Sequence, residues 1–390
     1  MKTISYLLTI LFLALLLSCS EEPPTNISNE SLSKKPAPPP PVVALPPLDQ
    51  GTKYIVGNSG SIIFIWDGHS LSQIWSRSLG TPFFGLGDFT DDGYKELIVI
   101  KSISEGHGHN KVTRLELLIF KEGDLEPSET VFLREVNGFQ DAVWDMKIVD
   151  IDGDGQVELI IVFRDQVEIW EYGSNGFYLS DSSYYFSSSD SPWRADFGDF
   201  DNDSIDEIII AFAGNYWRIY DYDGSSITSV FESSTFNEIG NLDCAKISDI
   251  DYDGTMEVVG GNYPDKILLW EAPYTNQPVF NTFPVFAYAP WAIGVGELDG
   301  DQVNGKEIIA GEVFNGGLHL LHYIGGSLVY GGEVYSGISV SMDGIVMSNI
   351  VNDNNLEIII GTGDGLLILD NSFNYLFSDN VGELERVICQ

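Results

Sequence analysis

From residue 51 onward, polar and apolar positions alternate in blocks that return about every 50 residues. Each block is a short acidic loop followed by an apolar run, such as the EIIIA sequence at 207–211. The loops are spaced by 62, 49, 50, 48 and 52 residues and begin at positions 88, 150, 199, 249, 297 and 349. Short apolar runs predict β-strands, and a period near 50 built from such strands is typical of a β-propeller blade.

Each repeat is expected to hold four strands, with the acidic loop between the first and the second. Third strands are predicted at 61–66, 114–120, 166–170, 216–220, 266–270, 317–322 and 365–369. Three strands between residues 53 and about 78, six full units of four strands and a lone strand at 384–389 make 28 strands. The prediction is an all-β, seven-bladed propeller whose C-terminal strand closes the first blade. Six or eight blades are the alternative counts.

The N-terminus has the pattern of a secretion signal, with Lys2 ahead of an apolar run at 4–17. This run is too short to cross a bilayer comfortably as a helix. The Leu-Leu-Ser-Cys sequence at 16–19 resembles the bacterial lipobox, in which Cys19 becomes the lipidated N-terminus of the mature protein. A plain signal peptide with a chance cysteine is the alternative interpretation.

A linker follows the signal, because residues 20–47 hold 9 of the 17 prolines. Proline-rich chain extends by about 3.1 Å per residue, which gives a reach of roughly 90 Å. The expected organisation is a signal peptide at 1–18, a lipidated cysteine and stalk at 19–47, and a propeller at 48–390. This places the head at the bacterial outer membrane or cell surface, with the periplasmic side also possible.

The acidic loops follow the pattern D-x-D-x-D-G-x-x-E, in which alternate carboxylates point into a tight turn. Such hard oxygen ligands suit Ca²⁺. An EF-hand would need Glu at position 12 between helices, whereas position 12 is Ile161 in the second loop and the flanks read as strands. The ligands predicted in three full loops are Asp150, Asp152, Asp154 and Glu158; Asp199, Asp201, Asp203 and Glu207; and Asp249, Asp251, Asp253 and Glu257.

Two further loops deviate from the pattern but keep enough acids to bind metal. Their predicted ligands are Asp88, Asp92 and Glu96, and Glu297, Asp299, Asp301 and Glu307. The sixth loop has Asn349 and Val351 in place of acids and is expected to have lost its metal. The alternative for every loop is a metal-free turn that caps itself through its Asp and Asn side chains.

Residues 51–390 resemble the FG-GAP and VCBS repeat family, which includes the integrin α-subunit head domains. The acidic loop is the specific signal, and the Phe-Gly dipeptide itself survives at 84–85 and 197–198. The resemblance implies a calcium-stabilised propeller with its metals on the face formed by the loops between first and second strands. It also implies binding to other molecules, without identifying them.

The charge of the chain limits the classes of molecule that it can bind. It has 58 acidic and 19 basic residues, and its formal net charge is −39. This field excludes a phosphate-driven nucleic-acid binder and disfavours docking onto anionic lipid. Three cysteines exclude a disulfide scaffold. We expect a monomeric head with three to five Ca²⁺ ions, joined to the membrane through its N-terminal lipid and binding an unknown protein or glycan.

A ligand surface is suggested where the inner strands begin, on the face opposite the acidic loops. Aromatic faces beside polar groups suit sugar or peptide recognition. The residues expected to gather there are Trp144, Asp145, Trp193, Arg194 and Trp291. The alternative is that these tryptophans seal the junctions between blades. The aromatic residues repeated in the third strands are expected to pack in the core.

No catalytic motif stands out, since the chain has neither a G-x-S-x-G nor an H-E-x-x-H sequence. His319 and His322 fall on repeated positions and are expected to be structural, while His107 and His109 make a thin transition-metal candidate. The expected function is non-catalytic binding by a calcium-stabilised lipoprotein. A polysaccharide-active enzyme, such as a lyase, or a structural assembly subunit are the alternatives.

Overall fold

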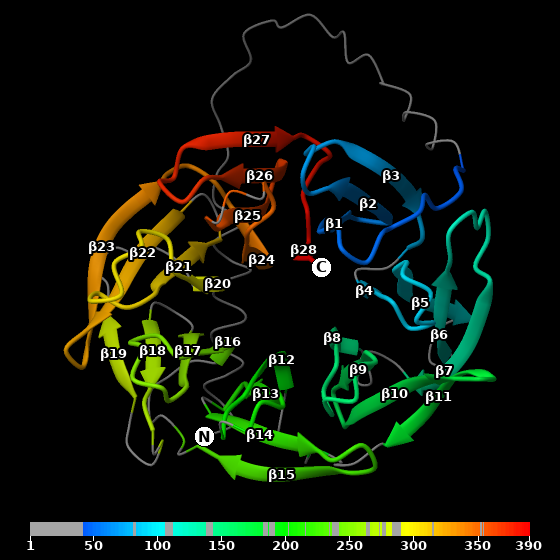
Figure 1. Ribbon diagram of the computed structural model, residues 1–390, viewed down its shortest axis with the longest axis horizontal. Helices are drawn as coiled ribbons and strands as arrows, with labels where there is room; N and C mark the ends of the chain where they lie inside the picture. The colour runs from blue at the N-terminus through cyan, green and yellow to red at the C-terminus, as the bar shows by residue number, and fades with distance from the viewer. Residues whose placement is uncertain are drawn as a thin grey trace, which may run out of the picture. The chain divides into compact units, whose positions relative to one another are not determined.

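Seven small antiparallel sheets stand around one central axis in the computed structural model (Figure 1). The structure describes residues 42–390 except for short gaps at 81–82, 106–111, 138–142, 182–185, 187–191, 202, 215, 234, 236–241, 263–265, 273, 275–277, 283–289, 314–315, 352 and 354. The described part holds 28 strands and no helix. The predicted seven-bladed β-propeller, with four strands in every blade, is confirmed.

The first blade joins the two ends of the described chain. Its strand order is β28 (Arg386–Cys389), β1 (Tyr54–Ser59), β2 (Ile62–Asp67) and β3 (Gln73–Ser78). In the antiparallel pair of β1 and β28, Asn58 lies opposite Arg386 and Ile55 lies opposite Cys389. The C-terminal strand therefore closes the ring as predicted and leaves no open seam between blades.

The other six blades each use four consecutive strands. They are β4 (Phe83–Gly87), β5 (Glu96–Glu105), β6 (Val112–Phe120) and β7 (Glu129–Asn137); β8 (Val143–Val149), β9 (Glu158–Phe163), β10 (Val167–Gly173) and β11 (Gly176–Asp181); β12 (Pro192–Gly198), β13 (Glu207–Phe212), β14 (Tyr216–Tyr222) and β15 (Ile227–Glu232); β16 (Leu242–Ser248), β17 (Glu257–Asn262), β18 (Lys266–Trp270) and β19 (Val279–Thr282); β20 (Pro290–Gly296), β21 (Glu307–Glu312), β22 (Gly317–Ile324) and β23 (Ser327–Tyr335); and β24 (Val340–Ser348), β25 (Glu357–Thr362), β26 (Gly365–Leu369) and β27 (Tyr375–Asp379).

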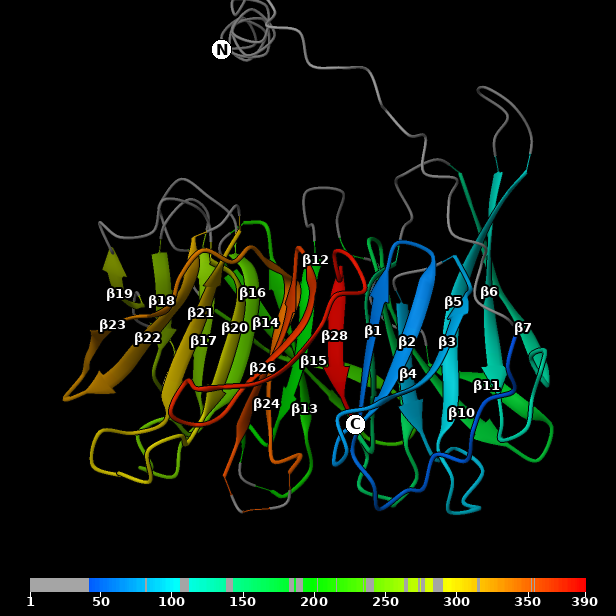
Figure 2. The same ribbon diagram turned by 90° about the horizontal axis from the view of Figure 1, so that it is seen from above.

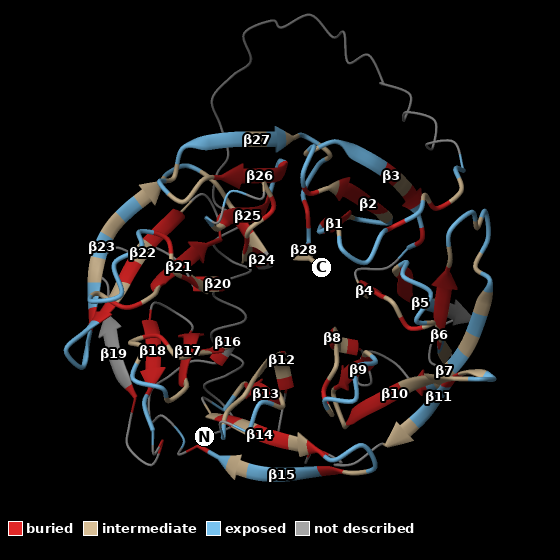
Figure 3. Cartoon of the chain, in the orientation of Figure 1, coloured by how far each residue is buried: buried red, intermediate tan, exposed pale blue. Residues whose placement is uncertain are grey.

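Burial falls from the middle of each blade to its outer edge (Figure 3). Every residue of β9, β13, β17, β21 and β25 is buried, whereas most of β15 is exposed or half-buried. A middle strand is covered on both faces by neighbouring blades, so its sequence is a continuous apolar run rather than an alternating one. This is the physical origin of the runs that follow the acidic loops.

The inner strands lie too close together for a side chain at some positions. A Cβ atom on Gly85 would lie 2.5 Å from Ile148 Cδ1 of the next blade. A Cβ atom on Gly198 would lie 2.6 Å from Cγ2 of Ile247, which belongs to the next blade. The glycine of each Phe-Gly dipeptide is therefore required by the close approach of the neighbouring inner strand.

The segment just before the first strand packs on the head. Leu45 and Leu48 are each 1% exposed and belong to the core shared by the first two blades. The backbone N–H of Leu45 donates to the carbonyl of Asp124 at 3.0 Å, and Trp75 Nε1 donates to the carbonyl of Val43 at 3.1 Å. Within the described residues, contacts with the head thus already include Val43, ahead of the expected start of the propeller at residue 48.

Candidate metal centres and ligand face

The acidic loops all lie on one face, because each leaves a first strand and enters a second strand. They form the lower rim of the ring in Figure 2. In five loops, oxygens of three acids lie within 4.8 Å of one another. The five sets are Asp88, Asp92 and Glu96; Asp150, Asp152 and Glu158; Asp199, Asp201 and Asp203; Asp249, Asp251 and Glu257; and Glu297, Asp299 and Glu307.

One hydrogen bond repeats at the turn of the four regular loops. The first aspartate accepts, through Oδ2, the backbone N–H of the residue five positions on, at 3.0 Å from Gly155 to Asp150. The equivalent bond from Ser204 to Asp199 is 2.9 Å. Gly155 has φ of 92°, and Ser204 has φ of 74° although it is not glycine. Position six therefore needs the left-handed region, and Ser204 occupies it at some cost in strain.

The closing glutamate, which stands at the ninth position of every loop except the longer fifth one, is the most buried acid of each loop. Glu158 Oε2 accepts the backbone N–H of Ile151 at 2.9 Å, and Glu257 Oε2 accepts that of Ile250 at 2.7 Å. The pKa of Glu158 is raised to about 8, mainly by burial and also by the nearby aspartates of the loop, while the backbone hydrogen bond opposes the shift. The pKa of Glu257 is likewise raised to about 8 by the same causes.

The third loop shows the same arrangement with a different set of clustered acids. Glu207 accepts the N–H of Phe200 at 2.6 Å, and burial raises its pKa to about 7. In this loop Asp203, rather than Glu207, forms the cluster with Asp199 and Asp201. A buried carboxyl group with a raised pKa, such as Glu207, is costly to ionise alone, so a cation bound beside it would stabilise its charged form.

The residues of these loops fit calcium. Their donors are all oxygens, the class that hard divalent cations prefer. Buried Asp150 Oδ1 and Asp249 Oδ1 have no hydrogen-bond partner among the described residues. Each belongs to the first acid of a cluster, whose other oxygen closes the turn. An ion would supply the missing partner.

Three acids predicted as ligands at the fifth position accept backbone hydrogen bonds and lie outside the acidic clusters. Asp154, Asp253 and Asp301 are exposed, and each accepts a backbone N–H two residues on, at 2.8, 2.8 and 3.1 Å. These are Asx turns that shape the loop. In these three loops the structure therefore groups the first acid, the third acid and the closing glutamate, and leaves the fifth-position acid at the rim.

The sixth loop keeps the scaffold without the acids. Glu357 Oε2 accepts the N–H of Ile350 at 2.7 Å, as in the other loops. Asp353 accepts the N–H of Asn355 at 2.9 Å. Among the described residues, no set of three acids comes together here. The ninth-position glutamate thus has a structural role that is separate from any metal.

The fifth loop differs in its surroundings. Glu307 Oε2 accepts the N–H of Leu298 at 2.7 Å, and His322 Nδ1 lies 3.4 Å from Glu307 Oε1. Asn304, which belongs to the two-residue insertion region, donates to Asp299 at 2.9 Å. The insertion therefore keeps the loop closed although its first acid is Glu297.

The opposite face carries the predicted aromatic residues. Trp144 and Trp193 meet edge to face, with ring centroids 4.7 Å apart. Their buried indole N–H groups have no acceptor among the described residues. Arg194 Nη1 donates to the backbone carbonyls of both tryptophans, at 3.0 Å to Trp144 and 2.7 Å to Trp193. These three side chains are therefore brought together as expected.

Trp291 lies in a separate pocket of about 230 Å³ on the same face. The pocket sits where the sixth, seventh and first blades meet, and its wall also contains Ser339, Ser341, Glu383 and Glu385. The pocket wall therefore combines one aromatic residue with hydroxyl- and carboxylate-bearing residues, of which Ser341 donates to the Leu384 carbonyl and Glu385 accepts from Asn58. Sequence reasoning missed the two glutamates, because they precede the closing strand and follow no repeat.

Asp145 is fully buried and acts from behind this face. It accepts the N–H groups of Met146 and Ala195, both at 2.8 Å, and pairs with Arg386. The Arg386 pair was not predicted, since it joins the third blade to the closing strand across 241 positions of sequence. Asp145 is thus a structural anchor between blades.

The third-strand aromatics pack in the core as predicted. Trp66 and Tyr220 are fully buried, and Trp270 is 1% exposed. His319 is also 1% exposed, with Nδ1 3.1 Å from the Tyr330 hydroxyl. His107 and His109, like the signal sequence and Cys19, lie outside the described residues. Within the described part of the chain, no helix is long and apolar enough to cross a membrane.

The ring of seven blades, with acidic loops between first and second strands, is a seven-bladed β-propeller that contains an FG-GAP-like repeat. Residues 150–210 match the family model of the FG-GAP-like repeat, from the start of the second acidic loop into β13. The predicted repeat is therefore confirmed at residues 150–210, and the predicted propeller fold is confirmed over the described residues.

Solved structures share this fold at low sequence identity. BBS1N, crystallised in complex with ARL6DN, is 12% identical with a TM-score of 0.53, over 84% of this chain and 93% of that chain. A putative 6-phosphogluconolactonase from Bacteroides uniformis is 11% identical with a TM-score of 0.57, over 87% of this chain and 99% of that one. At these identities the likeness shows the fold alone. No curated protein matches the sequence.

Proposed function

We propose that the protein is a calcium-stabilised, lipid-anchored binding propeller whose ligand lies on the face opposite the acidic loops. The observation that carries this proposal is the pocket around Trp291, with two serines and two glutamates in its wall. An aromatic ring with hydroxyl and carboxylate groups around it offers a stacking surface and directional hydrogen bonds. That combination favours a glycan over a flat protein surface.

The paired tryptophans support the same face. Trp144 and Trp193 are half-buried, and their indole N–H groups lack acceptors among the described residues. A buried donor without an acceptor costs free energy that a ligand oxygen could recover. The two rings also present apolar surface beside the polar backbone carbonyls bound by Arg194.

The acidic loops then serve stability rather than chemistry. Calcium in the five acidic clusters would reduce the repulsion within each loop and rigidify the turns that join first to second strands. Extracellular modules use calcium sites with dissociation constants of roughly 10⁻⁴–10⁻³ M. This suits a head carried outside the cytoplasm by a lipid on Cys19.

The binding proposal is tested with a panel of neutral and acidic glycans applied to the calcium-loaded full chain. Trp291→Ala should abolish binding of any glycan that the wild type retains. Tyr375→Ala is the matched control, because Tyr375 is 59% exposed on the outer strand β27. Loss of binding in both variants, or in neither, would contradict the proposed site.

Catalysis is tested on the same panel. A lyase or hydrolase would release shortened or unsaturated products on prolonged incubation with saturating protein. The proposal expects every bound glycan to be recovered intact. The anchor is tested separately: Cys19→Ala should release the protein from the membrane fraction of its bacterial host, whereas retention of this variant would contradict lipidation at Cys19.

A further inference from the structure

The central axis of the ring contains a cavity of about 170 Å³ that concentrates positive charge. Its walls come from the inner strands of six blades, mostly through small or aliphatic residues such as Ala195, Ala245 and Ile293. The chain has only 19 lysines and arginines against 58 acids. Four of these cations line this one cavity, and we call them the cationic channel: Lys147, Arg194, Lys246 and Arg386.

None of the described residues that line the cavity is acidic. Two carboxylates that pair with these cations, Asp145 and Asp196, are not among the lining residues and accept backbone N–H groups. Asp145 accepts two backbone N–H groups besides its pair with Arg386, and its Oδ2 lies 3.7 Å from Lys147 Nζ. Asp196 accepts the N–H of Ile247 at 3.2 Å and lies 3.3 Å from Lys246 Nζ. These two acids orient the cations without entering the cavity.

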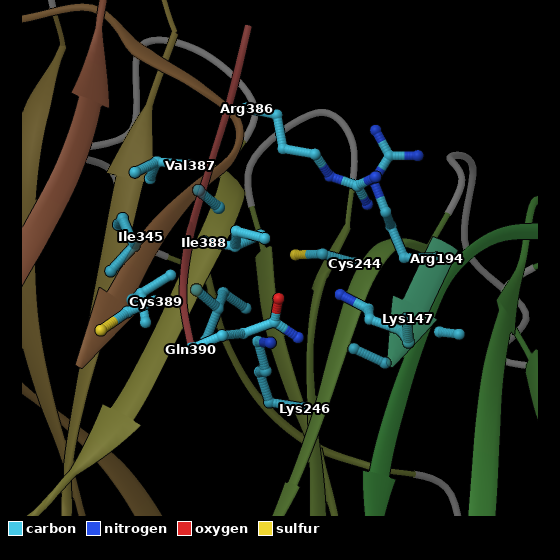
Figure 4. Close-up of a pocket in the computed structure, with 15 residues that line it drawn as sticks. Lys147, Arg194, Cys244, Lys246, Ile345, Arg386, Val387, Ile388, Cys389 and Gln390 are labelled. Carbon is cyan, nitrogen blue, oxygen red and sulfur yellow. The ribbon is translucent and has the colours of Figure 1, made fainter. Parts of the chain in front are cut away.

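The two arginines occupy the same end of the channel. Arg194 is bound to the carbonyl of Trp144, and Arg386 is bound to Asp145, the next residue of β8. Figure 4 shows their guanidinium groups near each other, with Lys147 and Lys246 extending into the cavity below them. Arg386 is further fixed over the Phe83 ring, 5.4 Å from its centroid. Asp145 and Asp196 offset part of the charge of the four cations, and among the described residues an excess of positive charge remains that an anion in the cavity would reduce.

We propose that the cationic channel binds the carboxylate of a small organic acid, such as the acidic sugar unit of a glycan. Guanidinium groups match a carboxylate with paired hydrogen bonds, and lysines add point charges. A volume of about 170 Å³ corresponds to roughly six waters at about 30 Å³ each, which is room for one small acid. The inference rests on the proposed binding function and adds the charge of the ligand to it.

The test measures binding of galacturonate and of galactose to the calcium-loaded full chain by titration calorimetry at low salt. The two sugars differ mainly in the carboxylate, and sulfate serves as an inorganic oxyanion. Galacturonate should bind at least tenfold more tightly than galactose and should compete with sulfate. Equal binding of the two sugars, or no galacturonate binding, would overturn the inference.

Variants locate the site. Lys246→Met should weaken galacturonate binding at least tenfold. Lys246→Arg, which keeps the positive charge, should retain most of the wild-type affinity. Lys101→Met, on β5 and outside the channel, removes the same charge and should leave binding unchanged. Melting temperatures of all variants verify folding. A Lys246→Met protein that folds and binds galacturonate like the wild type would overturn the inference.

The outcomes separate this inference from the proposed function. If a neutral glycan binds in a Trp291-dependent way while galacturonate does not bind, the channel inference fails and the binding face stands. If galacturonate binds in a Lys246-dependent way while no glycan depends on Trp291, the channel inference stands and the proposed pocket fails.

Discussion

Without metal, the buried ninth-position glutamates should make the head less stable as the pH rises. The pKa values of Glu158 and Glu257 are raised to about 8 in the folded protein and that of Glu207 to about 7, from 4.5. A carboxyl group with a raised folded pKa stabilises the fold fully below its unfolded pKa. That contribution is lost as the pH rises through the folded pKa. The affected window is therefore about pH 4.5 to 8.

The size of the effect follows from proton linkage. Between about pH 5 and 6.5, the folded state holds one more proton on each of the three glutamates than the unfolded state. Each proton lowers the unfolding free energy by at most about 1.4 kcal/mol per pH unit, and three together by about 4 kcal/mol per pH unit. Bound calcium would ionise the same groups at every pH in the window, so its stabilising effect should grow from pH 5 to pH 8.

The assay is urea unfolding at several pH values from 5 to 8, in EDTA and in Ca²⁺. Glu158→Gln keeps an oxygen for the Ile151 N–H but cannot ionise, so it should remove about a third of the slope in EDTA and one loop's share of the calcium response. Glu357→Gln makes the same change at the matched bond to Ile350 in the sixth loop. It should leave the calcium response unchanged. Stability in EDTA that is constant or rises over this range would refute the reasoning.

Three further predictions concern the ring and its loops. Gly85→Ala places a Cβ against Ile148 and should destabilise the head by about 1–3 kcal/mol in urea unfolding; an unchanged midpoint would show that the inner strands can move apart. Deleting residues 386–390 removes the closing strand and should replace the single cooperative melt, followed by circular dichroism, with a broad transition at lower temperature; a melt like that of the wild type would contradict the role of closure. Asn349→Asp combined with Val351→Asp restores acids to the sixth loop and should add one calcium ion to the native mass spectrum, whereas an unchanged ion count would show that acid content alone does not make the site.

The sequence predicted the parts of this molecule that repeat. The period near 50, the apolar runs and the third-strand aromatics such as Trp270 all arise from the packing of one blade against the next, so they recur in every unit. The five loops expected to hold metal are the five in which acids come together. The acids of each loop are close together in the sequence, so a short sequence pattern is enough to predict that their side chains meet.

The parts that do not repeat could not be predicted. Lys147, Lys246 and Arg386 come from separate blades, and only ring closure brings them to one cavity. The pairing of Arg386 with Asp145 joins residues 241 positions apart, and no local pattern encodes it. The packing of Leu45 on the first blades was also missed, because the surrounding prolines dominate that stretch of sequence. Contacts between single residues that are far apart in the sequence can be identified only from the folded structure.

The most direct test of calcium as the stabilising ion of this propeller is ion counting combined with a thermal melt. Native mass spectrometry of the full chain would count bound ions while the melting temperature is followed in EDTA, Ca²⁺ and Mg²⁺. The account predicts three to five calcium ions, in line with the five acidic clusters, and a large rise in melting temperature that Ca²⁺ produces and Mg²⁺ does not. Absence of bound ions together with identical melting temperatures in EDTA and Ca²⁺ would contradict it and leave the acidic loops as metal-free turns.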